Sequence, residues 1–166
     1  MSESPRVESI VARLGDSLLT WDGFLAQVAS ESFGAVWLTG GYRMNWNDAA
    51  TAEKLAGVKT LIVQDCFPSP LWERGDFQLP SATFAEREGS YVNFNDVLQS
   101  FTWSIRPPAG VMTDGKLYWQ LLKKPGLYNA KRVLEDIARE IAYFAPAAQG
   151  VPDTGIDLKV SLLAAT

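Results

Sequence analysis

The sequence contains no histidine and a single cysteine, Cys66. Without histidine, neither a zinc site of the usual type nor a histidine general base is expected. One cysteine excludes a disulfide within the chain, and iron–sulfur clusters need about four thiolates. We therefore expect the chain to hold no metal ion and no cofactor of its own.

Long apolar runs are also missing. Apolar runs such as residues 35–38 and 60–63 are far shorter than the roughly 20 residues that span a bilayer. Residues 1–5 lack the basic region and apolar stretch of a signal peptide. These observations predict a cytoplasmic location without direct membrane insertion, and they leave open peripheral docking on a membrane complex.

The charge is weak and unclustered, with 15 basic against 19 acidic residues and a formal net charge of −4. Nucleic-acid binding depends on clustered lysine and arginine, so no nucleic-acid partner is expected. The hydrophobic fraction of 47% is that of an ordinary globular protein. A chain of 166 residues is most simply one domain.

Short apolar runs with turn signals on both sides predict an α/β fold. Residues 35–38 and 60–63 are expected to be buried strands, with a helix from about 48 to 56 between them and a shorter strand at 76–79. This order indicates a right-handed βαβ unit and a parallel sheet. The prolines at 68 and 70 predict an irregular segment over 67–72, because proline has no N–H.

The remaining segments predict helices around this core. Apolar residues at 7, 10, 11 and 14 fit one face of a helix, and a second helix is expected from about 20 to 29. Residues 116–123 predict a short helix and residues 130–144 a long one with an apolar stripe. An edge strand is expected at 101–105 and one late strand at 156–162.

The expected architecture is therefore a small three-layer domain, with a short parallel sheet flanked by helices and an irregular C-terminal half. We predict a single domain over 1–166. Its N-terminal helices occupy 1–30, the βαβ core lies within 35–93, and a C-terminal extension covers 94–166.

An ordered series of motifs carries a family resemblance over residues 35–122. Its centre is the pattern LP-x-A-x-x-x-E-x-x-G-x-x-x-N, which begins at Leu79-Pro80 and ends at Gly89 and Asn93. Before it come Gly40-Gly41 after the first strand and Gln64-Asp65 at the end of the second; after it comes a Pro-Pro-Ala-Gly run at 107–110. The series resembles the molybdopterin oxidoreductase superfamily, and within it the C-terminal part of the large iron–sulfur subunit of NADH:quinone oxidoreductase (complex I).

The resemblance implies a non-catalytic structural or assembly domain in NADH-linked electron transport, with other respiratory-complex subunits as partners. Molybdopterin and iron–sulfur clusters would be held by other segments, so the chain looks like a detached C-terminal portion of a larger subunit. One departure concerns the cofactor. Phe94-Asn95 follows Asn93, where relatives usually carry a glycine and an arginine that suit a pyrophosphate.

The candidate binding residues belong to two loops, and neither catalytic nor metal-binding residues are predicted. Gly40, Gly41 and Arg43 follow a strand and precede a helix, which is a place where α/β sheets bind ligands. Gly89 and Asn93 form the second loop of a vestigial pocket. The simpler interpretation of both loops is a tight turn, with Arg43 in solvent.

Two other functions stay open. The chain could be a fragment of an active molybdopterin oxidoreductase, such as a formate dehydrogenase-like enzyme, and form one wall of the cofactor site. Alternatively, it could be a free-standing module that binds a small anion at the loops of Gly40 and Gly89.

Overall fold

The structure is a computed structural model that describes residues 10–11, 13, 18–31, 33–41 and 46–159. By their contacts, these described residues separate into two compact units. The parallel-sheet unit comprises residues 19–86 and 106–117, and the antiparallel-sheet unit comprises residues 87–105 and 118–166 with the N-terminal residues 1–18. A single domain over the whole chain therefore stays a prediction, and each unit is described by itself.

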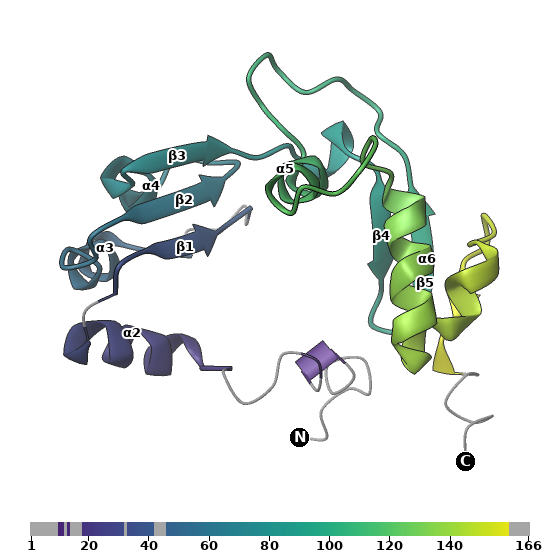
Figure 1. Ribbon diagram of the computed structural model, residues 1–166, viewed down its shortest axis with the longest axis horizontal. Helices are drawn as coiled ribbons and strands as arrows, with labels where there is room; N and C mark the ends of the chain where they lie inside the picture. Colours follow the sequence, from purple (N-terminus) through teal and green to yellow (C-terminus); the bar gives the residue numbers. More distant parts are fainter. Residues whose placement is uncertain (1–9, 12, 14–17, 32, 42–45, 160–166) are drawn as a thin grey trace. The chain divides into compact units, whose positions relative to one another are not determined.

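The parallel-sheet unit contains the strands that the sequence predicts. Strands β1 (Val36–Thr39), β2 (Leu61–Asp65) and β3 (Phe77–Pro80) lie side by side in that order and run parallel (Figure 1). Val36 pairs with Leu61 in the first ladder, and Ile62 pairs with Phe77 in the second. The predicted α/β fold with a short parallel sheet flanked by helices is confirmed.

Helices α2 (Trp21–Ser30) and α3 (Ala49–Lys54) begin at the polar residues that the sequence offers as caps. The Thr20 hydroxyl accepts from the Gly23 amide, and the Asp48 carboxylate accepts from the Thr51 amide. Such bonds satisfy amides that have no partner within the helix. The helices and strands bury one core, which consists of Val28, Val36, Leu38, Ala52, Leu55, Leu61, Val63 and Leu71.

The segment after β2 is more regular than its two prolines predict. Helix α4 (Pro70–Arg74) begins inside the stretch 67–72 that we expected to be irregular. Proline is well tolerated at the first helical position, because the amide it lacks would have no helical partner there. The Ser69 hydroxyl then caps the helix by accepting from the Trp72 amide at 3.2 Å.

The cap of α3 predicts a pH dependence. Hydrogen bonds from the Thr51 hydroxyl and amide hold the pKa of Asp48 below its usual value of 3.8. Because the folded-state pKa is the lower one, this stabilisation is present above the unfolded-state pKa and is lost as the pH falls through the folded-state pKa. Asp48→Asn, which caps without a charge, should lose less stability than wild type in thermal melts over this acid range. If the melting temperatures of the two proteins fall equally as the pH is lowered, the charge of Asp48 does not contribute to the cap.

The antiparallel-sheet unit contains β4 (Gly89–Val92), β5 (Val97–Phe101) and β6 (Ile156–Asp157) in that order. Gly89 pairs with Phe101 across the β4–β5 hairpin, and β6 pairs only with Val97 and Leu98 within the described residues. The edge strand expected at 101–105 is displaced toward the N-terminus, because the turn at 93–96 sets the register of β5. The strand expected at 156–162 extends only to Asp157 among the described residues.

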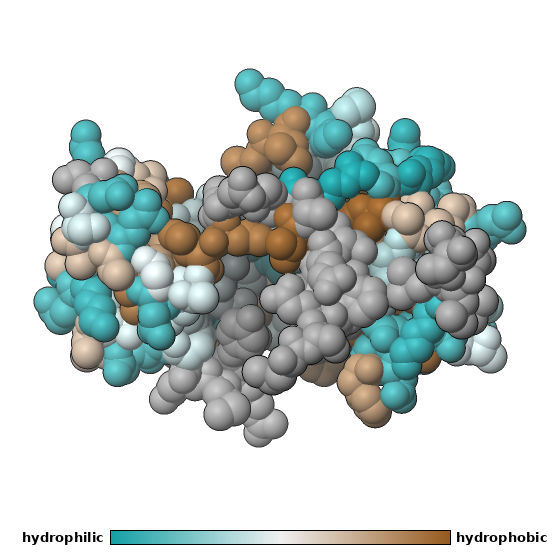
Figure 2. All heavy atoms as spheres, turned by 90° about the horizontal axis from the view of Figure 1, so that it is seen from below, coloured by the Kyte–Doolittle hydropathy of each residue, from teal (hydrophilic) through white to brown (hydrophobic). Residues whose placement is uncertain are grey.

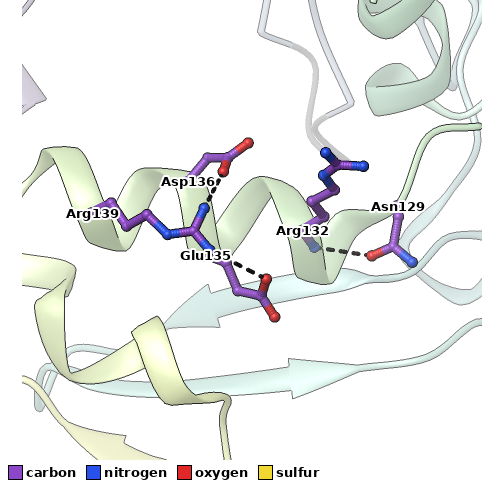
Figure 3. Close-up of polar contacts among 5 residues, drawn as sticks. All are labelled: Asn129, Arg132, Glu135, Asp136 and Arg139. Carbon is purple, nitrogen blue, oxygen red and sulfur yellow. Dashed lines mark hydrogen bonds and ion pairs between the residues drawn. The ribbon is translucent and has the colours of Figure 1, made fainter. Parts of the chain in front are cut away.

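Helix α6 (Ala130–Glu140) packs on this second sheet, as Figure 1 shows. The Asn129 side chain accepts from the Arg132 amide at 2.9 Å and caps the helix (Figure 3). Arg139 pairs with Asp136 at 2.6 Å and approaches Glu135 at 3.8 Å on the same helix. The helix ends before the predicted residue 144, because Ile141 is extended and the 3-10 helix η3 (Ala142–Gln149) follows. The core of the unit consists of Leu98, Leu134, Ala138, Tyr143, Phe144, Ala147 and Leu158.

Removing the cap should weaken α6. Asn129→Ala leaves the Arg132 amide without its side-chain acceptor, which typically costs about 1 kcal/mol. Lys131→Ala, an exposed change in the same turn, should alter stability by less than about 0.5 kcal/mol. Urea unfolding of the two variants would test the cap. Equal midpoints would show that it contributes nothing.

Apolar side chains also reach the surface. Figure 2 shows them among polar side chains on one face of the molecule. The most exposed large ones are Phe94 at 90% and Leu127 at 92%. Among the described residues, no helix is long and apolar enough to cross a bilayer.

Candidate functional site

The carboxyl ends of β1 and β2 meet around the side chain of Asp65, which is only 3% exposed. Oxygen Oδ1 accepts from the backbone amides of Gly41 at 2.9 Å, Cys66 at 2.6 Å and Phe67 at 3.2 Å. Oxygen Oδ2 accepts from Nε1 of Trp46 at 2.9 Å. The buried carboxylate is therefore satisfied by donors of the protein itself, without any cation or ligand.

The glycine pair after β1 is fitted to this carboxylate. A Cβ atom on Gly40 would lie 2.0 Å from Oδ2 and 2.4 Å from Cγ of Asp65. Gly41 has a φ of +106°, which residues with a side chain rarely adopt. Its amide donates one of the hydrogen bonds that Asp65 accepts. The Gly40 amide donates to the Gln64 carbonyl at 2.7 Å. The amides of the two glycines in the predicted anion site therefore donate to acceptors within the unit.

A second polar network ties the strand ends to the start of helix α5 (Asp114–Leu121). The Gln64 side chain accepts from Nε1 of Trp37 at 3.2 Å and donates to the Asp114 carboxylate at 2.7 Å. The Ser81 hydroxyl donates to the same Asp114 oxygen at 2.8 Å. This network fixes the edge of the sheet where α/β proteins place their ligands.

Next to this edge lies a pocket of about 300 Å³. Its polar lining includes Asp65, Cys66, Ser81, Thr83 and Glu86. Among the described residues, none that lines it is lysine or arginine. Its ionisable lining is dominated by carboxylates, so the pocket suits a ligand that donates hydrogen bonds better than it suits an anion.

Two of these lining residues have local structural roles. The Glu86 carboxylate accepts from the amide and the hydroxyl of Thr83, at 2.8 and 3.0 Å, which holds the turn after β3. The Cys66 thiol approaches the Ala82 carbonyl at 3.7 Å. Among the described residues, no cluster of His, Cys, Asp and Glu is arranged to hold a metal ion.

The second predicted loop belongs to the antiparallel-sheet unit. The Asn93 side-chain oxygen accepts from the amides of Asn95 at 2.9 Å and Val97 at 3.1 Å, so it shapes the β4–β5 turn. Asp96 in the same turn has a φ of +62° and accepts from the Tyr143 hydroxyl at 2.5 Å. These contacts give Asn93 a structural task. A ligand-binding role for it stays a prediction.

Gly89 lies at the start of β4, beside an aromatic pair. A Cβ atom there would come within 3.2 Å of the Phe101 ring, which stacks on Tyr91 with centroids 4.8 Å apart. Gly89 also lines a cavity of about 710 Å³ between β4, β5, η3 and the beginning of α6. Gly89 and Gly40 belong to different units. Arg43 lies outside the described residues.

Sequence reasoning misses the residue around which the first loop is organised. It places Asp65 at a strand end and does not link the carboxylate to Gly40 and Gly41. The signal is present, because a glycine pair and an aspartate follow neighbouring parallel strands, whose carboxyl ends meet at one edge of the sheet. The contact with Trp46 has no such signal.

Comparisons with known proteins point to one family. The family described as "Molybdopterin oxidoreductase" matches residues 13–124. The F420-dependent formate dehydrogenase subunit alpha of Methanocaldococcus jannaschii is 31% identical over 108 residues, which cover 63% of this chain and 16% of the relative. The F420-dependent formate dehydrogenase 1 subunit alpha of Methanococcus maripaludis is 31% identical over 100 residues, covering 58% of this chain and 15% of the relative. The chain thus matches only a small part of these relatives, and both are formate dehydrogenase subunits.

Proposed function

The chain belongs to the molybdopterin oxidoreductase family, and from that premise we propose that it forms a structural portion of a formate dehydrogenase-type oxidoreductase, without catalytic activity of its own. The observation that supports this proposal is that the polar groups at the carboxyl edge of the parallel sheet are hydrogen-bonded to one another. There, the Asp65 carboxylate already accepts the donors that a ligand would need. The edge acts as a wall rather than as a reaction centre.

The described residues at this edge do not fit a pyrophosphate-bearing pterin. The amides of Gly40 and Gly41 donate to Gln64 and Asp65. The neighbouring pocket carries the Asp65 and Glu86 carboxylates, which would repel a phosphate. No step of a redox reaction is therefore assigned to these residues.

The narrower assignment to the large iron–sulfur subunit of complex I is the competing proposal within the same family. It is supported by the order of the motifs from Gly40 to the Pro-Pro-Ala-Gly run at 107–110. The formate dehydrogenase relatives favour a fragment of an oxidoreductase of their own type over a role in NADH-linked electron transport. The small-anion module loses support, because the amides of Gly40 and Gly41 in its first loop donate to protein acceptors.

Affinity purification of the tagged full chain from its source cells would test the proposal. We expect formate dehydrogenase-type subunits to co-purify, and native mass spectrometry of the isolated chain to show the mass of the polypeptide alone. Subunits of NADH:quinone oxidoreductase in their place would favour the complex I assignment. A stoichiometric pterin on the isolated chain would overturn the structural role.

A further inference from the structure

One face of the parallel sheet carries an apolar row. Trp37 pairs in register with Ile62, and Ile62 with Phe77, so the three side chains stand next to one another across β1, β2 and β3. Trp37 is 38% exposed and Phe77 is 58% exposed. By contrast, Leu61 and Val63, which point to the other face of β2, are 2% and 0% exposed. The row therefore presents aromatic surface that the fold of this unit does not bury.

The helices of this unit pack on the opposite face. Val28 of α2, Ala52 of α3 and Leu71 of α4 share one core with the strand residues that point away from the row. Right-handed crossovers in the strand order β1-β2-β3 bring both connecting helices to the same face. Parallel sheets occur almost only with both faces covered. Among the described residues of this unit, the row thus lies on the side of the sheet without a full helical layer.

The carboxyl end of this face is closed by the beginning of α5. Gln64 lies two residues after Ile62 and so points to the same side of β2. Gln64 and Ser81 both donate to the Asp114 carboxylate. The Trp37 indole donates to the Gln64 side chain at 3.2 Å, which fixes the position of its ring. The row therefore lies beside a helix end that the unit itself positions on this face.

The width of the row matches one helix. Neighbouring strands lie about 4.8 Å apart, so three residues in register span roughly 10 Å, which is about the diameter of an α-helix with its side chains. The whole face lies within residues 13–124, which match the family. The matched stretch covers only 16% and 15% of the two relatives, so a larger polypeptide of this kind has sequence available to supply a covering helix.

We propose that the face of Trp37, Ile62 and Phe77 is a docking surface for an amphipathic helix of a larger formate dehydrogenase-type polypeptide. This inference rests on the proposed function, because that function supplies the larger polypeptide. Trp37 and Phe77 are the anchors, since a few aromatic side chains that become buried on association carry most of the binding energy in many interfaces. The helix places its apolar stripe on the row.

The first test compares Phe77→Asp with Leu19→Asp in the tagged full chain. Both side chains are more than half exposed, at 58% and 54%, but Leu19 precedes α2, which packs on the opposite face. Phe77→Asp should lower the yield of co-purified formate dehydrogenase-type subunits by roughly tenfold, and Leu19→Asp should change it by less than about twofold. If both variants capture these subunits as wild type does, the docking surface is wrong and the proposed function stands. If wild type captures none, both proposals are wrong.

Photo-crosslinking keeps the test decisive if Phe77→Asp disturbs folding. A photoreactive phenylalanine analogue at position 77 keeps the aromatic ring and should crosslink to a helical segment of a formate dehydrogenase-type subunit, identified by mass spectrometry. The same analogue at position 19 should give no such product. A crosslink from position 77 to a second copy of the chain, or to another part of the same chain, would overturn the proposal, because the face would have a different occupant. So would the absence of any crosslink from position 77 in the purified complex.

Discussion

Gly40→Ala should destabilise the parallel-sheet unit by about 3–5 kcal/mol, although it adds only one methyl group. The added Cβ would lie 2.0 Å from Oδ2 of Asp65, well inside van der Waals contact. The carboxylate cannot simply turn away, because Trp46 and the amide of Gly41 hold it. Displacing it breaks several charge-assisted hydrogen bonds, each worth about 1.5–3 kcal/mol.

Gly57→Ala is the matched control for this prediction. It lies in the same unit, and a Cβ there would meet nothing within 4 Å. It should leave stability unchanged or raise it slightly, because alanine restricts the unfolded chain more than glycine does. Urea unfolding followed by tryptophan fluorescence would compare the two. A loss of less than about 1 kcal/mol for Gly40→Ala would show that the carboxylate is free to move.

Asp65→Ala should be comparably damaging, at about 3–5 kcal/mol, for a different reason. It leaves the amides of Gly41, Cys66 and Phe67 and the indole of Trp46 without their acceptor. A donor left unsatisfied in a buried site costs about 1–3 kcal/mol. Because the side chain is 3% exposed, these donors lose their acceptor in a largely buried site.

Trp46→Phe tests the hydrogen bond to Asp65 separately from the packing of the aromatic ring. It removes one donor to Asp65 and keeps most of the apolar ring, so a loss of about 1 kcal/mol is expected. Asp65→Asn keeps one acceptor oxygen and should fall between Asp65→Ala and wild type. Equilibrium unfolding of all variants would rank them. A loss for Asp65→Ala no larger than that for Trp46→Phe would refute the central role of the carboxylate.

The parallel sheet could be predicted because its signals are local. Val36, Leu38, Leu61 and Val63 form short apolar runs with turn residues on both sides, and the helix between them has both a cap and a stop. Such runs are typical of buried strands whatever else the chain does. The structure places the strands within a few residues of the expected positions.

The second sheet is less accessible to sequence reasoning, because its signals are not local. β5 carries an alternating pattern too weak to fix its ends, and its register depends on the Asn93 turn and the positive φ of Asp96. β6 is only two residues long and exists because it pairs with Val97 and Leu98. The prediction of a strand at 101–105 is therefore wrong in its position.

The candidate site divides in the same way. The sequence locates its loops at Gly40, Gly41, Gly89 and Asn93. The reason these positions need their residues cannot be predicted, because it lies in contacts with side chains that are distant in sequence. Gly40 is explained by Asp65, and Gly89 by Phe101. A glycine can be needed because a side chain packs closely against it or because a ligand does, and the sequence looks the same in both cases.

The two compact units are interleaved along the polypeptide, which limits how the chain can be divided. The parallel-sheet unit returns at residues 106–117 after an excursion of 19 residues, 87–105, through the other unit. A protein cut after Glu86 would lose Asp114, to which Gln64 and Ser81 are bonded. The residues that complete the parallel-sheet unit therefore lie on both sides of the β4–β5 segment. A breakpoint between the two sheets would separate residues 106–117 from the rest of the parallel-sheet unit.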